Sequence, residues 1–199
     1  MTRTVHKEVA LRMNLPTGSI GVFLAGDFYT VPAFDKRGGS GDVSELWRGF
    51  ADDFDWVIGV AGNHDSFGED RNAAPRFNDR RIHYLDNQRV TVEGLKIAGL
   101  AGIIGNPSRM RRRSEDSYCK ASEELLDSQT DILITHDGPD APPHGFVGST
   151  LVREALEILQ PRLGIRGHAH WNEPFVELDG GVNVLNVDAR VVILRERPA

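Results

Sequence analysis

Four short apolar runs in this chain each end in residues whose side chains commonly bind metal ions. Short runs of this kind, with glycine near the exit of three of them, are typical of buried strands. The residues that follow the runs are Asp27; Asn63, His64 and Asp65; His136; and His168 and His170. Open α/β sheets place their functional groups at strand ends. The sequence therefore predicts a sheet scaffold that gathers Asp, Asn and His side chains at one edge.

The length and composition are those of one globular domain. A chain of 199 residues can bury a substantial core, so we expect a single domain over residues 1–199. The one cysteine, Cys119, cannot form an internal disulfide, which suits a reducing compartment. No apolar stretch reaches the roughly 20 residues of a membrane helix, and the first residues lack the apolar core of a signal peptide. We therefore expect a cytoplasmic protein that does not enter a membrane.

The net charge argues against one class of partner. At a formal charge of -6 the chain lacks the basic surface that binds a nucleic-acid polymer through its backbone. A small phosphate-bearing substrate is still compatible, because bound metal ions would invert the local charge.

The remaining pattern predicts both helix-linked and hairpin-linked strands, which indicates mixed sheets with helices outside. We expect helices over residues 7–14, 43–54, 115–126 and 150–159. We expect further strands over residues 82–84, 89–92, 95–100, 175–178, 182–185 and 191–194.

The types of ligand residue favour particular metals. Imidazole together with carboxylate and amide oxygens, without thiolate, points to Mn²⁺, Fe or Zn²⁺ in a hydrolytic site. Two ions about 4 Å apart, bridged by one carboxylate, would activate water and hold a phosphoryl group. Asp27 is the candidate for the bridging carboxylate.

The order of the motifs resembles that of the calcineurin-like metallophosphoesterase family, in particular its small single-domain phosphodiesterase branch. The matching motifs are Gly26-Asp27, Gly62-Asn63-His64-Asp65, Thr135-His136 and Gly167-His168-Ala169-His170. The resemblance implies an α/β fold, a four-layer α/β/β/α sandwich of two mixed sheets flanked by helices. It also implies a metal-dependent phosphoesterase that cleaves phosphodiesters or phosphomonoesters by attack of a metal-bound hydroxide. The substrate would be a small phosphate ester, with nucleotides among the candidates.

The same resemblance assigns roles to individual residues. Asp27 would bridge both metals, His170 would belong to the first site, and the second site would be completed by Asn63, His136 and His168. His64 would assist the leaving group, and Asp65 would orient and polarise its ring. One or two divalent ions would be bound per chain, with Mn²⁺ expected first and Fe, Ni²⁺, Co²⁺ or Zn²⁺ as alternatives.

The chain departs from the family pattern at its N-terminal motif. Where the family has Asp-x-His, this chain has Thr4-Val5-His6 with only three residues before it, so we expect either weak binding of the first metal or an N-terminal strand that is shortened or altered. His6 fits a ligand position of the first metal. A hydroxyl is a much poorer ligand than a carboxylate, so Thr4 predicts weak binding of that metal.

Some residues have two interpretations. The Arg-rich segment 109–113, preceded by Asn106, would either receive a phosphate through Asn106 and Arg109 or form a solvated loop. Trp171 would either stack on a substrate or pack under the site. His83 and His144 are more simply structural residues.

A second function class is also compatible with the fold. Some proteins of this shape act as interaction scaffolds with a weakened metal site, and Thr4 gives that alternative weight. His64 favours the enzyme, because a scaffold does not need a leaving-group histidine.

Overall fold

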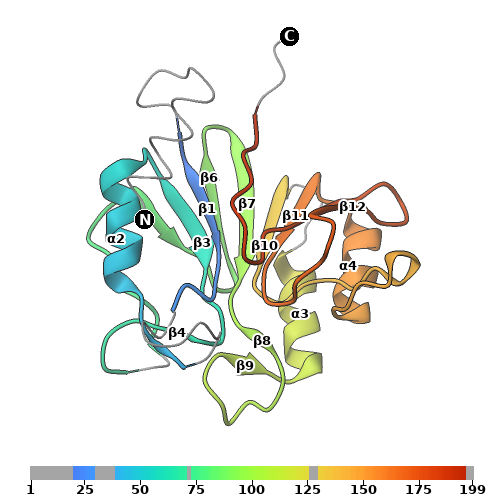
Figure 1. Ribbon diagram of the computed structural model, residues 1–199, viewed down its shortest axis with the longest axis horizontal. Helices are drawn as coiled ribbons and strands as arrows, with labels where there is room; N and C mark the ends of the chain where they lie inside the picture. The colour runs from blue at the N-terminus through green and yellow to red at the C-terminus, as the bar shows by residue number, and fades with distance from the viewer. Residues whose placement is uncertain (1–19, 30–38, 71–72, 126–129, 196–199) are drawn as a thin grey trace.

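Two β-sheets pack face to face in the computed structural model, which describes residues 20–29, 39–70, 73–125 and 130–195 (Figure 1). The smaller sheet has the order β1-β3-β5, and both of its pairings are parallel. Its strands are β1 (Val22–Ala25), β3 (Val57–Val60) and β5 (Ile82–Tyr84).

The larger sheet has six strands in the order β12-β13-β11-β10-β7-β6. Its four central strands are parallel, and the two edge strands, β6 and β12, run antiparallel to their neighbours. The bounds are β6 (Gln88–Val92), β7 (Leu95–Leu100), β10 (Ile132–Thr135), β11 (Leu163–Arg166), β12 (Phe175–Glu177) and β13 (Asn183–Asn186).

Helices cover the outer faces of both sheets. The helix α2 (Ser44–Asp53) packs on β3 and β5, whereas α3 (Glu115–Leu125) packs on β7 and on α4 (Thr150–Leu159). The hydroxyl of Ser149 caps α4 by accepting from the backbone N–H of Val152 at 3.3 Å. The four-layer α/β/β/α arrangement expected from the motifs is therefore confirmed (Figure 1).

The core between the sheets explains why the four apolar runs become strands. All four residues of β3 and all four of β10 are buried, so both faces of these strands meet other side chains. Burying an aliphatic side chain of this size contributes about 1.5–3 kcal/mol. Packing between β1, β3 and β10 thus fixes the positions of the residues that directly follow them.

Three expectations need correction or fall outside the described residues. The three described strands of the smaller sheet are all parallel, so that sheet is not mixed in this part of the chain. Residues 191–194 form no strand, because β13 is already flanked by β11 and β12 and the chain turns away at Ala189, whose φ is 55°. The helix expected over residues 7–14 lies outside the described residues.

Four short strands and a short helix were not expected from the sequence. They are β2 (Gly41–Asp42), β4 (Asp65–Ser66), β8 (Ile103–Ile104), β9 (Arg112–Arg113) and the 3-10 helix η1 (Pro142–His144). β2 pairs with β4 and β8 pairs with β9. The segments β4, β8 and β9 mark the edge of the sheets where the long parallel strands end (Figure 1).

Within the part of the chain that the structure describes, no helix is both long and apolar enough to cross a lipid bilayer.

Candidate metal centre

Three of the expected ligand residues come together where β1, β10 and β11 end. One ligand atom each from Asp27, His136 and His168 lies within 4.8 Å of the other two. Nε2 of His136 lies 3.2 Å from Oδ2 of Asp27, and the rings of His136 and His168 have centroids 5.1 Å apart. Residues that are far apart in the sequence meet because β10 and β11 are parallel neighbours that end level with one another, and β1 of the other sheet packs against β10.

Two buried polar atoms at this edge lack a hydrogen-bond partner among the described residues. They are Nε2 of His136, which is near Asp27 but not aligned for a hydrogen bond, and Oδ1 of Asn63. Leaving a buried polar atom without a partner costs about 1–3 kcal/mol. A divalent cation would satisfy both atoms, and the donor set of carboxylate, amide oxygen and imidazole suits Mn²⁺, Fe or Zn²⁺. The residues present therefore fit one metal ion.

Glycine before Asp27 and before Asn63 is required by close packing. A Cβ on Gly62 would lie 2.0 Å from Oδ1 of Asp27, and one on Gly26 would lie 2.4 Å from the backbone nitrogen of Gly62. Gly26 also has a φ of 83°, which side chains disfavour. The two motifs contain glycine because their backbones touch.

Two of the clustered ligands have unusual backbone conformations. Asp27 has a φ of 54° and His168 a φ of 64°, both in the left-handed region that non-glycine residues rarely adopt. Such conformations persist where the surrounding structure enforces them, and they concentrate at functional sites.

The charges within the cluster support one another. Burial alone would raise the pKa of Asp27, but the contact with the His136 ring and its charge outweighs burial and lowers this pKa. Burial likewise would lower the pKa of His136, but Asp27 outweighs it and raises the pKa. Burial, followed by the charge of His136, lowers the pKa of His168, which favours the neutral imidazole that binds metals.

The carboxylate of Asp65 does not orient the His64 ring, contrary to the role expected for it. Its Oδ2 accepts from the backbone N–H groups of Asp27 (2.7 Å) and Gly62 (2.9 Å), and its Oδ1 accepts from Phe28 (2.8 Å) and Tyr29 (3.1 Å). Burial raises the pKa of Asp65, while these N–H donors oppose that shift. Asp65 therefore fixes the loop that presents Asp27.

Replacing Asp65 by asparagine is expected to lower the free energy of unfolding by about 2–4 kcal/mol, because the new NH₂ group would face backbone donors that lose their acceptor. Metal affinity should fall too, since the loop carrying Asp27 is no longer fixed. Urea unfolding of the metal-free protein and metal titration measure the two effects. Asp179→Asn, at an exposed turn, serves as the control; a D65N variant as stable as this control would contradict the role.

His64 is held by a carbonyl group. Its Nδ1 lies 2.6 Å from the carbonyl oxygen of Gly39 and 3.4 Å from the hydroxyl of Ser40, and its backbone N–H donates to Oδ1 of Asp27 at 3.0 Å. A carbonyl oxygen only accepts, so Nδ1 carries a proton and Nε2 is the nitrogen left for chemistry. Sequence reasoning missed Gly39, because a backbone acceptor leaves no residue-specific signal.

His170 is not part of this cluster, and its expected place in the first metal site stays a prediction. Its ring is half exposed, with Nδ1 3.3 Å from Oδ2 of Asp188. Nη2 of Arg190 lies 3.1 Å from its Nε2. The sequence patterns did not identify Asp188 or Arg190. Asp188 did carry a signal, because it is a polar residue just after a strand, like the residues that follow the four apolar runs. Thr4 and His6 lie outside the described residues.

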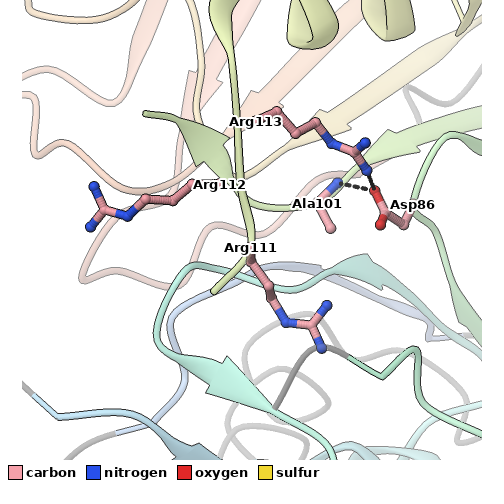
Figure 2. Close-up of a pocket in the computed structure, with 5 residues that line it drawn as sticks. All are labelled: Asp86, Ala101, Arg111, Arg112 and Arg113. Atoms are coloured by element: carbon pink, nitrogen blue, oxygen red, sulfur yellow. Dashed lines mark hydrogen bonds and ion pairs between the residues drawn. The ribbon is translucent and has the colours of Figure 1, made fainter. Parts of the chain in front are cut away.

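The Arg-rich segment lines a small polar cavity of about 170 Å³ together with Asp86 and Ala101 (Figure 2). Figure 2 shows Arg113 turned toward Asp86, to which it donates at 2.7 Å, and Arg112 turned the other way. Arg111 donates to the Asp65 carbonyl and to the Tyr84 hydroxyl. Arg111 and Arg113 thus make hydrogen bonds to other residues of the protein near the strand ends.

The structure does not gather Asn106 and Arg109 with the metal ligands. Both are exposed, and Oδ1 of Asn106 accepts from the backbone N–H of Ser108 at 3.0 Å. The backbone N–H of Arg109 donates to the Asn106 carbonyl, also at 3.0 Å. These contacts form a surface turn, so any contact of Asn106 or Arg109 with a substrate stays a prediction.

Trp171 is a packing residue. It is fully buried, its Nε1 donates to the Val147 carbonyl at 2.9 Å, and its ring stacks on Phe146. The guanidinium of Arg166 lies 4.8 Å from the Trp171 ring centre and donates to the carbonyl groups of Pro139 and Val147. Burial lowers the pKa of Arg166 to about 10. Sequence reasoning did not single out Arg166, which ties together the loops after β10 and β11.

Comparisons with solved structures support the fold. The chain is 14% identical to the TT1561 protein of Thermus thermophilus, with a TM-score of 0.58 over 94% of this chain and 83% of that one. It is 15% identical to phosphopantetheinyl hydrolase (PptH) of Mycobacterium tuberculosis, with a TM-score of 0.50 over 85% and 79% of the two chains. At these identities the likeness concerns the fold alone.

A third solved structure is longer than this chain. The identity is 18% and the TM-score is 0.51 over 72% of this chain, which spans 62% of the other, less than two thirds of its length. The comparison with curated proteins gave no match. The family model described as calcineurin-like phosphoesterase matches residues 10–172, which include all three clustered ligands. The chain therefore belongs to the calcineurin-like phosphoesterase family.

Proposed function

We propose that this protein hydrolyses small phosphate esters with a divalent metal ion held by Asp27, Asn63, His136 and His168. The observation that carries the proposal is a pair of buried atoms that have no hydrogen-bond partner among the described residues, Asn63 Oδ1 and His136 Nε2, beside a three-residue cluster of ligands. A purely structural site would satisfy such atoms with hydrogen bonds. The family match supports phosphoester hydrolysis as the activity.

The residues around the metal would have separate roles in the reaction. When bound, the metal would polarise a phosphoryl oxygen and lower the pKa of water. In its doubly protonated form, His64 would donate the Nε2 proton to the leaving oxygen and become a neutral imidazole, while Nδ1 keeps its proton and its hydrogen bond to Gly39. Asp65 would keep Asp27 in place through backbone N–H groups and would take no part in proton transfer.

The substrate class and the metal follow from charge and ligand chemistry. The formal charge of -6 disfavours a nucleic-acid polymer and leaves small phosphodiesters or phosphomonoesters, nucleotides included. The mixed nitrogen and oxygen ligands favour Mn²⁺ first, with Fe, Ni²⁺, Co²⁺ and Zn²⁺ as alternatives.

Metal-dependent hydrolysis is the direct test. The purified chain is incubated with bis-p-nitrophenyl phosphate and with p-nitrophenyl phosphate in Mn²⁺, Ni²⁺, Co²⁺, Mg²⁺ or Zn²⁺. We expect turnover to be fastest with Mn²⁺ and to fall to background in excess chelator. Undiminished turnover in chelator would refute the proposal. A protein that binds metal but hydrolyses neither ester would favour the interaction scaffold instead.

A further inference from the structure

The turn after β13 is attached to the loop that carries His168 and His170. The backbone N–H of Val187 donates to the Arg166 carbonyl at 2.8 Å, and the amide Nδ2 of Asn186 donates to the Ala169 carbonyl at 2.7 Å. Oδ1 of Asn186 in turn accepts from the backbone N–H of Asp188 at 3.0 Å. Residues 186–190 are therefore hydrogen-bonded to the loop that carries His168 and His170, although no sequence motif indicated them.

Two side chains of this turn contact the ring of His170. Oδ2 of the buried Asp188 lies 3.3 Å from Nδ1. Nη2 of Arg190 lies 3.1 Å from Nε2 and 3.4 Å from Nδ1, and it also donates to the Trp171 carbonyl at 2.6 Å. The Trp171 carbonyl and the His170 ring together fix the position of the Arg190 guanidinium.

This arrangement does not fit a metal ion bound to His170. A divalent ion on Nε2 would lie about 2.1 Å from that nitrogen, beside a guanidinium that is charged at any physiological pH. Two cations so close repel each other, which disfavours a metal ion at this position. The sequence expectation that Thr4 replaces a carboxylate ligand of this metal points the same way, although Thr4 lies outside the described residues.

We propose that the guanidinium of Arg190 takes the place of the first metal ion of the family and binds the phosphoryl group of the substrate. The proposal rests on the proposed function, since it assigns the second positive charge of that same site. Two N–H groups of a guanidinium form a fork that can donate to two phosphate oxygens at once, and the group stays positively charged. It can therefore neutralise and orient the phosphate, as a bound metal ion would. The guanidinium contacts His170, which follows the clustered ligand His168 by two residues in the same loop.

The first experiment counts the metal ions in the full-length wild-type protein. We expect elemental analysis after dialysis against Mn²⁺ to find about one ion per chain. The electron paramagnetic resonance spectrum should be that of isolated Mn²⁺, because ions about 4 Å apart would be magnetically coupled. Two retained ions with a coupled spectrum would overturn the proposal.

The second experiment measures binding of inorganic phosphate to the Mn²⁺-loaded protein by calorimetry. Arg190→Met should weaken phosphate binding about 10- to 100-fold, the usual effect of losing a hydrogen bond to a charged group. Arg190→Lys, which keeps the charge but loses the fork, should fall between wild type and R190M. The exposed Arg195, in the same C-terminal segment, provides the control variant Arg195→Met, which should bind phosphate as wild type does.

Phosphate binding by R190M equal to that of wild type would overturn the proposal. If R190M does not fold, R190K carries the test, because wild-type affinity in R190K would likewise show that the fork makes no contact with phosphate. Neither the metal count nor the phosphate affinity requires turnover. Failure of the proposed ester hydrolysis is therefore distinguishable from failure of this assignment.

Discussion

Replacing His136 by alanine is expected to lower metal affinity by at least about 100-fold and to reduce hydrolysis to the level of the chelated wild-type protein. Loss of a residue that merely supports a ligand costs 10- to 100-fold, and His136 is a ligand itself. Its Nδ1 lies 2.7 Å from the Ala25 carbonyl, which leaves Nε2 directed toward Asp27. Metal titration and elemental analysis measure the change.

The control for this variant is His144→Ala. His144 is exposed in η1 and stacks on Phe146, away from the cluster, so its loss should leave metal content and turnover unchanged. Thermal unfolding of both metal-free variants separates a lost ligand from a lost fold. Full metal retention by a folded H136A variant would remove His136 from the site and with it the proposed centre.

Replacing His64 by alanine is expected to lower kcat by about 10² or more while metal content stays near that of wild type, the scale usual for a lost general acid. The metal is retained because the contact that His64 makes with Asp27 comes from its backbone N–H, at 3.0 Å, which alanine keeps. The side chain itself contacts Gly39 and Ser40, neither of which is in the ligand set.

The leaving group provides a sharper test of His64. A poor leaving group such as an alkoxide needs the proton more than p-nitrophenolate does, so H64A should lose more activity toward an alkyl ester than toward the nitrophenyl ester. Equal losses on both esters would mean that His64 does not act as the acid. Loss of metal from H64A would instead make His64 a ligand.

Asn63 and Asp65 show how far a motif can be interpreted without coordinates. Both stand in one stretch of four residues, and the sequence predicted that each contributes to the site. The amide oxygen of Asn63 is buried without a hydrogen-bond partner among the described residues, and its role as a ligand stays a prediction. The carboxylate of Asp65 accepts from the backbone of residues 27–29 and of Gly62 and not from the His64 ring, because these four N–H donors converge on it. A residue type indicates what a side chain can bind, whereas its partner depends on which groups the fold brings near.

The residue pattern was enough to predict the scaffold and the edge at which the ligands gather. Short apolar runs bounded by glycine are typical of strands buried inside a sheet, and a polar residue directly after such a run lies at the end of the strand. The tertiary structure decided which of those ends meet: Asp27, His136 and His168 come together, whereas His170 faces Asp188 and Arg190. The reason is that β13 packs beside β11, which brings the turn after β13 to the His170 ring. No local sequence pattern predicts this contact.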